Sequence, residues 1–582
     1  MTIFSANSQN SARTAGLRAR QVAAWLLSSA LALVMGGCGS SSDPPSTSNP
    51  GGPTTFPAPP PGPDATLTAA DVTSIVQAAA ASVNDETLVI AVVDRQGEVL
   101  GLYQKPSAPA NSTYFGQTID APDLAVGLAR ATAFFSIDQA PLSTRSLRFL
   151  GEIHFPPGVM NQGNGDLYSI ESSNRGCRLD SAAVPFNTGK ALLQADYQAL
   201  SPPFPANTPG FGIVIGKADV MDSNPAAVNP GGVPIYKKNV NGDTFMVGGI
   251  GVVASNIDVA EYAAFSGAFS PGFGLVVPFP GEVLIGGVAL PFVNNKTVPA
   301  GFTAGTADGA YVAGFSPKDA AGPTPEGYLI GPVAGALGGL TQAQVDEIIQ
   351  AGITTASQTR SALRLPQGSR TQMSLAVADL DGTIIALYRM RDSTIESVDV
   401  AVTLARNEIY FNGPNVVKGD LPQIPAGTAV TNGAINFMGQ PLFPVGIDGS
   451  PVGPLFFLYV NDVATIFSHT CGQASQPLGP NQSGTTFLAA GGVGLYDQAS
   501  GKLLGALGVR GDGADRDDFV ANGAASGFVN PLPTCTGTNC YLPSPGIRTD
   551  QYCINAAGAL LPCGSTGAVR LPFSKFPRNP TD

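Results

Sequence analysis

The sequence has few histidines and few charged side chains. Among its 582 residues only His154 and His469 are histidine, and charged residues make up 12%, where about 25% is usual for a soluble domain. Two histidines give a Ser-His-Asp triad or a histidine-rich metal centre little to work with, so catalysis is not the expected role. The net charge of −12, with no basic patch, argues against nucleic acid or anionic lipid as the main partner.

The N-terminal apolar run is too short to span a membrane. It covers residues 22–34, whereas a hydrocarbon core of ~30 Å requires about 20 helical residues. Arg13, Arg18 and Arg20 precede this run. Basic residues followed by a short apolar run are typical of a signal peptide.

Cys38 marks the expected processing site. Val34-Met35-Gly36-Gly37-Cys38 resembles a lipobox, at which residues 1–37 would be removed and the thiol acylated, for instance with palmitate. Gly39, rather than an aspartate, follows the cysteine, which favours the outer membrane. We therefore expect an exported, lipid-anchored protein of the bacterial envelope, with residues 38–66 as a Ser/Pro/Gly-rich tether. A plain signal peptide cut nearby, or an N-terminal membrane anchor, is the alternative.

The remaining cysteines are even in number, which suits disulfides in an oxidising compartment. Four lie in a polar tail, residues 529–582, that is poor in core residues and needs covalent staples. A four-cysteine metal site is the alternative, but the tail lacks the C-x2-C knuckles of zinc modules. The sequence does not choose among the pairings. The disulfide candidates are Cys177, Cys471, Cys535, Cys540, Cys553 and Cys563.

An internal repeat organises the rest of the chain. The segment that begins Leu67-Thr68-Ala69-Ala70-Asp71 matches one that begins Leu340-Thr341-Gln342-Ala343-Gln344. In each copy the threonine can cap a helix, and the residue three positions on can bond back to the cap. Apolar residues at helical spacing follow, so each copy is predicted to open with an amphipathic helix.

Both copies continue alike. Each has two β-branched, apolar runs joined by Asp-x-x-Gly, at Asp94 and at Asp379, which predicts a β-hairpin. A second helix carries Leu-Ala-Arg at residues 128–130 and 404–406. Each copy ends with a glycine-rich strand pair and a short helix, and glycine that recurs in apolar strands indicates close backbone packing. A phosphate-binding reading of residues 248–251 is weak, because neither a Lys-Ser/Thr pair nor Rossmann spacing follows.

Two long insertions interrupt the copies, at residues 136–230 and 412–490. Loops of this length are usually functional or form an interface. Residues 271–339 are expected to be a linker, within which residues 282–292 look like a strand that docks on a neighbouring sheet. The four aspartates at 512, 515, 517 and 518 are read as the charged start of the last helix. An EF-hand is the alternative, but it would need a 12-residue loop that ends in glutamate.

The order and spacing of these motifs resemble the GlcG/HbpS haem-binding family. The resemblance covers residues 67–270 and 340–528, apart from the insertions. It implies an α+β fold: two profilin-like domains, each an antiparallel sheet of about five strands with helices packed on it. Family members often form larger oligomers, so a homo-oligomer or an envelope protein partner is expected. The two copies would themselves supply a pseudo-dimer.

The resemblance implies haem, or a related tetrapyrrole, as the cofactor. Some family members place a histidine at the hairpin turn, where this chain has Gln96-Gly97-Glu98 and Asp381-Gly382-Thr383. Haem iron is held by His, Cys, Met or Tyr, so other side chains must be considered, although packing or core roles are commoner for these residue types. The haem-ligand candidates are His154, His469, Tyr103, Tyr388, Met390 and Met438.

Three functions remain open at this stage. The first is an envelope-anchored haem or tetrapyrrole binder that binds or senses its ligand. The second is a structural or interaction lipoprotein that kept the fold without the ligand. The third is a haem-degrading protein, which requires that haem binds first.

Overall fold

The structure is a computed structural model. It describes residues 65–114, 116–170, 214–217, 228–274, 283–413, 421–457, 489–497, 499–526, 541–542, 546–577 and 580–581. Several predictions fall outside these ranges. They are the signal peptide, Cys38 and most of the tether, together with His469, Cys177, Cys471, Cys535 and Cys540.

The first half of the chain builds a five-stranded antiparallel sheet in the order β5-β6-β1-β2-β9. The predicted hairpin is the pair β1 and β2, and the predicted glycine-rich pair is β5 and β6. The strands are β1 (Val89–Asp94), β2 (Val99–Gln104), β5 (Gly232–Lys238), β6 (Thr244–Val253) and β9 (Ala310–Tyr311).

The second half repeats this order. Its sheet runs β10-β12-β11-β14-β13-β15, so its hairpin and glycine-rich pair occupy the same places as in the first sheet. The strands are β10 (Gly327–Ile330), β11 (Ser374–Ala378), β12 (Ile384–Arg389), β13 (Gly492–Asp497), β14 (Leu503–Arg510) and β15 (Tyr541–Leu542).

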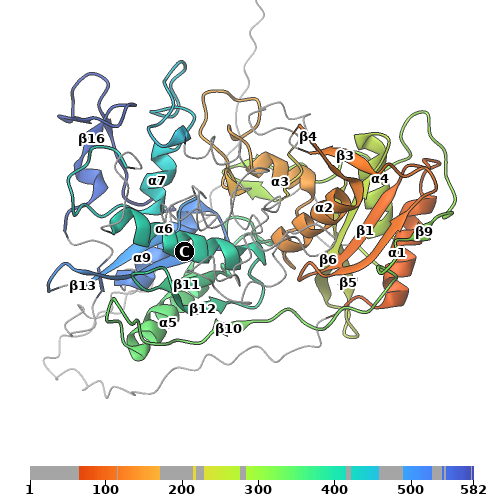
Figure 1. Cartoon of the computed structure of the whole chain (residues 1–582), viewed down its shortest axis with the longest axis horizontal. Coiled ribbons are helices and arrows are strands. Elements are labelled where there is room, and N and C mark those ends of the chain that lie inside the picture. Colours follow the sequence, from red (N-terminus) through yellow and green to blue (C-terminus); the bar gives the residue numbers. More distant parts are fainter. Residues whose placement is uncertain are drawn as a thin grey trace, which may run out of the picture. The chain divides into compact units, whose positions relative to one another are not determined.

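Helices cover both faces of each sheet (Figure 1). On the first sheet α1 (Ala69–Ala81) and α4 (Ile257–Ala268) share a core on one face, and α2 (Ala121–Phe135) packs on the other. On the second sheet α5 (Gln342–Gln358) and α9 (Ala514–Ser526) correspond to α1 and α4, and α6 (Glu396–Asn412) corresponds to α2. The predicted mixture of helices with antiparallel sheet is confirmed, whereas the division into GlcG/HbpS-like domains stays a prediction.

Both opening helices begin with the predicted capping box. The Thr68 hydroxyl accepts a hydrogen bond from the Asp71 amide, and the Asp71 carboxylate accepts one from the Thr68 amide. Thr341 and Gln344 make the same exchange at α5. Each box satisfies two amide groups that a helix start otherwise leaves without partners.

Glycine allows α2 and α6 to lie directly on their sheets. A Cβ atom at Gly251 in β6 would lie 1.9 Å from the Ala125 carbonyl oxygen of α2. A Cβ atom at Gly508 in β14 would lie 2.0 Å from the Ala401 carbonyl oxygen of α6. No side chain separates helix from strand at these points, which confirms the close backbone packing predicted from the glycines.

The linker completes both sheets, but not with the predicted segment. Residues 282–292 were expected to dock on a sheet, yet β7 (Leu284–Ile285) and β8 (Val288–Ala289) pair only with each other. Instead β9 joins the edge of β2, and β10 joins the edge of β12. Too short to show periodicity in the sequence, β9 is fixed by its partner strand rather than by its own pattern.

Tyrosine pairs fasten both linker strands. Tyr311 lies opposite Tyr103 with ring centroids 5.2 Å apart, and Tyr328 lies opposite Tyr388 with centroids 5.0 Å apart. Both pairs are edge-to-face, the arrangement that aromatic rings prefer. The same cross-strand pair therefore closes the edge of each sheet.

The two insertions contact each other. The described parts of the insertions include the short helices α3 (Thr144–Leu150) and α7 (Asn432–Met438). Beyond these helices, the Gln440 side chain accepts a hydrogen bond from the Asn164 amide at 2.9 Å and donates one to Asn164 Oδ1 at 2.6 Å. The insertions thus form an interface within the chain.

The C-terminal tail is held by a disulfide between Cys553 and Cys563. Around it lie three short paired strands, and the tail contacts the second half through hydrogen bonds such as that from the Lys575 amide to Asp518. A disulfide in the tail was predicted, and this pairing is one the sequence left open. The strands are β16 (Cys553–Ile554), β17 (Leu560–Leu561) and β18 (Val569–Arg570).

Candidate binding pocket at the first hairpin turn

The turn between β1 and β2 is built by three residues that the sequence analysis singled out. Asp94 Oδ1 accepts a hydrogen bond from the Glu98 amide at 2.8 Å, and Gly97 has φ 84°, a conformation that favours glycine. Arg130, from the Leu-Ala-Arg motif of α2, donates from Nε to the Gly97 carbonyl at 2.8 Å. The motif therefore fastens the second helix to the turn.

The second half uses the same device. Gly382 has φ 81°, and Arg406 of α6 donates from Nε to its carbonyl at 3.0 Å. Burial lowers the pKa of Arg406 to about 9, against a weaker opposite effect of Asp381. The sequence showed the two arginines as a matched pair, but it did not show that each one binds a turn.

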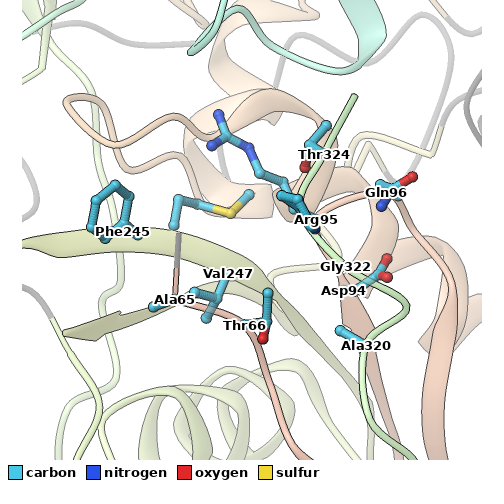
Figure 2. A pocket seen from close by; sticks show the side chains of 12 residues that line it. Ala65, Thr66, Asp94, Arg95, Gln96, Phe245, Val247, Ala320, Gly322 and Thr324 are labelled. Carbon is cyan, nitrogen blue, oxygen red and sulfur yellow. The ribbon is translucent and has the colours of Figure 1, made fainter. Parts of the chain in front are cut away.

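A pocket of about 380 Å³, open to solvent, lies beside the first turn (Figure 2). Much of this volume is open solvent, and the enclosed part, about 30 Å³, is far below the ~300–1,000 Å³ found for ligand sites. Figure 2 shows Asp94 and Gln96 of the turn across from Phe245 of β6. The pocket is lined by Ala65, Thr66, Asp94, Arg95, Gln96, Phe245, Met246, Val247, Ala320, Gly322, Pro323 and Thr324.

Asp94 has an unused hydrogen-bond acceptor at this pocket. Its side chain is 3% exposed, and Oδ2 has no hydrogen-bond partner. Burial raises the pKa of Asp94 to about 6, in spite of the hydrogen bond from the Glu98 amide, and the charge of Glu98 adds to the rise. Near neutral pH the carboxyl is thus close to its titration point and can accept or donate a hydrogen bond.

The equivalent carboxylate in the second half is fully used. Asp379 accepts hydrogen bonds from the amides of Leu337 at 2.9 Å and of Gly338 at 2.7 Å. These residues immediately precede α5, so the chain itself fills the position beside the second turn. The repeat is therefore asymmetric: one aspartate is closed by its own backbone, and the other faces a pocket.

Arg95 brings no free positive charge to the pocket. Its Nη2 lies 2.6 Å from Asp392 and its Nη1 lies 3.6 Å from Asp138, which also accepts a hydrogen bond from the Met246 amide. Burial alone would lower the pKa of Arg95, but Asp392 and Asp138 raise it. Burial, reinforced by the charge of Asp392, raises the pKa of Asp138 to about 6.

Among the described residues, the predicted haem ligands lie in separate internal contacts. The Tyr103 hydroxyl donates to the Ala307 carbonyl, and burial together with Asp308 raises its pKa. Tyr388 pairs with Tyr328, and burial raises its pKa too. Both tyrosines thus help to fasten linker strands.

The other described candidates are also engaged in internal contacts. Met390 lies in the core of the second sheet, where its sulfur accepts a hydrogen bond from the Met373 amide at 3.3 Å. Met438 is fully buried at the end of α7. His154 Nδ1 is 2.8 Å from the Gln162 carbonyl oxygen. His469 lies outside the described residues.

Met246 was missed by the sequence analysis. It lines the pocket and carries a thioether, a ligand type that haem iron accepts, although Met246 is only 2% exposed and packs in the core beside α2. Its position could have been found from strand pairing, because Asp94 lies opposite Gly248 and places the residues just before Gly248 beside the turn. The register of β1 with β6 is the signal, and the sequence alone gives the strands but not their neighbours.

Comparisons with known proteins are sparse. No family model matches the chain, and no curated protein matches it. A crystal structure of a PduOC–haem complex is similar, with 18% identity and a TM-score of 0.20, and the match covers 31% of this chain and 89% of that one. Klebsiella pneumoniae protein ORFY, of the DUF336 family, is similar with 15% identity and a TM-score of 0.19, over 31% of this chain and 85% of that one. At these scores the similarity carries no functional argument.

The described ranges contain neither a candidate membrane span nor a candidate metal cluster. No helix there combines the length and the apolar character that a membrane span needs. No three His, Cys, Asp or Glu side chains there gather in a way that could hold a metal ion.

Proposed function

We propose that this chain is an envelope-anchored binding protein whose ligand, a haem or related tetrapyrrole, occupies the pocket at the first hairpin turn. The observation that carries the proposal is the asymmetry between the two turns. In the second half the chain covers Asp379 with its own backbone, whereas Asp94 faces a solvent-open pocket. The motif resemblance to GlcG/HbpS proteins supplies the ligand class.

Two features of the pocket support a haem: one thioether donor and several apolar side chains. Met246 would ligate the iron, and the iron would supply redox chemistry when bound. Phe245, Val247 and Pro323 would pack against the ring, and apolar contact is the main source of affinity in such sites. Arg95 is neutralised by Asp392 and Asp138, so we assign it no role in pairing with the haem carboxylates.

A hemin titration tests this proposal. The purified full chain in detergent should give a saturable Soret shift, and Met246→Leu should weaken binding at least tenfold or change the shape of the Soret band. Met390→Leu is the matched control, because that sulfur lies in the core of the second sheet, and it should bind hemin as the wild type does. Unsaturable binding, or equal spectra for wild type and Met246→Leu, would contradict the assignment.

A second function has an observation in its favour. Tyr103 and Met390 use their ligating atoms in internal contacts, and His154 uses one of its two ring nitrogens. This supports a structural or interaction lipoprotein that kept the fold without the ligand. Mild cross-linking in native envelope, followed by pull-down, would then capture a partner, while the hemin titration would show no saturable binding.

We also propose that Cys38 is acylated and anchors the protein in the outer membrane. The lipobox-like residues before it and Gly39 after it support this location. Metabolic labelling with a palmitate analogue should label the wild type and not Cys38→Ser, and the variant should leave the membrane fraction. Labelling that persists in Cys38→Ser would contradict the anchor.

A further inference from the structure

A second pocket, of about 410 Å³, lies between the two halves of the repeat, and nothing in the proposed function uses it. Most of its wall is apolar, from both halves, and one end carries ionisable groups. The apolar residues are Phe135, Leu142, Leu150, Leu167, Ile285 and Leu363. The ionisable residues are Asp166, Glu396, Arg510 and Asp512.

Glu396, at the start of α6, has an unused oxygen at this pocket. The side chain is 3% exposed; Oε1 accepts a hydrogen bond from the Thr394 hydroxyl at 3.1 Å, and Oε2 is buried with no partner. A buried polar atom without a hydrogen bond is unfavourable. Burial raises the pKa of Glu396, although Arg510 acts in the opposite direction. Glu396 Oε2 therefore needs either a proton of its own or a ligand group that donates a hydrogen bond to it.

Arg510, the cation among the described residues that line the pocket, already has partners. Arg510 Nη1 lies 3.0 Å from Asp517 Oδ2, and its Nη2 donates to the Asp166 carbonyl oxygen at 3.2 Å. Its Nε is 4.0 Å from Glu396 Oε1, at the limit of an ion pair. Arg510 therefore pairs closely with Asp517 and only at long range with Glu396, and Glu396 Oε2 keeps no hydrogen bond.

Two more carboxyl side chains, Asp166 and Asp512, line this pocket. Asp512 accepts hydrogen bonds from the Ser361 hydroxyl and the Ala362 amide. Burial raises the pKa of Asp512 to about 6, opposed by the bond from Ser361 and by the charges of Arg364 and Arg516. Both arginines are themselves paired, Arg364 with Asp392 and Arg516 with Asp515. The ionisable end of the pocket therefore repels anions and suits a cation.

We propose that this pocket binds an organic ammonium ion that carries an apolar body, with Glu396 as its counter-ion. The apolar wall would bury the body of the ligand, and Glu396 Oε2 would accept the ammonium hydrogen bond that no described residue supplies. A bare metal ion fits less well, because the described residues bring no group of three His, Cys, Asp or Glu side chains together in metal-binding geometry. The site is separate from the hairpin-turn pocket, since the two share no lining residue.

Calorimetry with three probes of one shape tests the proposal: 2-phenylethylammonium, 2-phenylethanol and 3-phenylpropanoate, at pH 7 with the full chain. We expect saturable binding of the ammonium ion, at least tenfold weaker binding of the alcohol and none of the carboxylate. Glu396→Gln should weaken binding of the ammonium ion at least tenfold and leave binding of the alcohol unchanged. Glu347→Gln, at an exposed position of α5, is the control for loss of one charge and should change nothing.

Leu363→Trp supplies an independent variant, because this side chain is only partly buried and the larger ring would fill the pocket. It should abolish binding of both the ammonium ion and the alcohol, while the hemin titration and the thermal melt stay as in the wild type. The proposal is overturned if the wild type shows no saturable ammonium binding, or if Glu396→Gln binds the ammonium ion as tightly as the wild type. A negative hemin result would leave these readings unaffected.

Discussion

At the scale of single residues, the two hairpin aspartates show how one motif acquires two environments. The Asp-x-x-Gly pattern predicted both turns, and the glycine conformations agree with it. The pattern could not predict the hydrogen-bond partners of each carboxylate. Asp379 meets the amides of Leu337 and Gly338, while Oδ2 of Asp94 meets none. That difference depends on tertiary packing of the segments before α1 and α5, which no local spacing records.

Asp94 should make the protein less stable as pH rises. Its folded-state pKa is about 6, above the ~3.9 of an unfolded chain, so the folded state holds the proton more tightly between these values. Stability should therefore fall from about pH 4 to about pH 6 by an amount on the order of 2–3 kcal/mol. Asp94→Asn keeps the Oδ1 acceptor for Glu98 and removes this titration. In urea unfolding at pH 4, 5, 6 and 7, the difference between variant and wild type should grow with pH; a constant difference would contradict the assignment.

At the scale of helices and strands, most of the prediction rested on local chemistry and was confirmed. Capping boxes begin α1 and α5, and the glycines of β6 and β14 admit the helices that cross them. The prediction was wrong in the linker. Its apolar run at residues 282–292 was expected to join a sheet, and it does not. The segments that join the sheets are β9 and β10, held by tyrosine pairs and by the free edges of β2 and β12. A strand of two residues has no pattern that could reveal it.

Gly508→Ala should be severely destabilising. The added methyl would lie 2.0 Å from the Ala401 carbonyl oxygen and 2.6 Å from the Ala405 amide nitrogen, so α6 must move off its sheet. We expect a loss of at least about 4 kcal/mol, beyond the ordinary range for single substitutions. Gly331→Ala is the matched control, since nothing lies within 4 Å of a Cβ there. Chemical unfolding should place that variant within ~0.5 kcal/mol of the wild type; a similar loss in both variants would refute the steric argument.

At the scale of the whole molecule, the halves are joined by more than the linker. One hydrophobic cluster contains Phe135 and Leu147 of the first half with Ile395 and Leu404 of the second. Ion pairs cross the same boundary, such as Arg95 with Asp392. The internal repeat predicted two matched sets of elements, but the surfaces that face each other include the insertions, whose sequences carry no periodic signal.

Cutting the linker should leave the halves together. A protease site inserted after Gly314, between β9 and β10 in a largely exposed stretch, divides the chain while each sheet keeps its linker strand. After cleavage, size-exclusion chromatography should still show one species with both fragments, and the melting temperature should fall by only a few degrees. Separation of the fragments under native conditions would show that the buried boundary contributes little.

The late position of β9 in the sequence also determines when the first sheet can be completed. An exported chain emerges from its N-terminus, so β1, β2, β5 and β6 are complete well before residues 310–311 appear. Until then the edge of β2 offers unpaired backbone groups, the kind of edge to which another nascent chain can add. The long, glycine- and proline-rich linker therefore delays the pairing of the β2 edge. A chaperone that shields strand edges would be needed most before β9 is available.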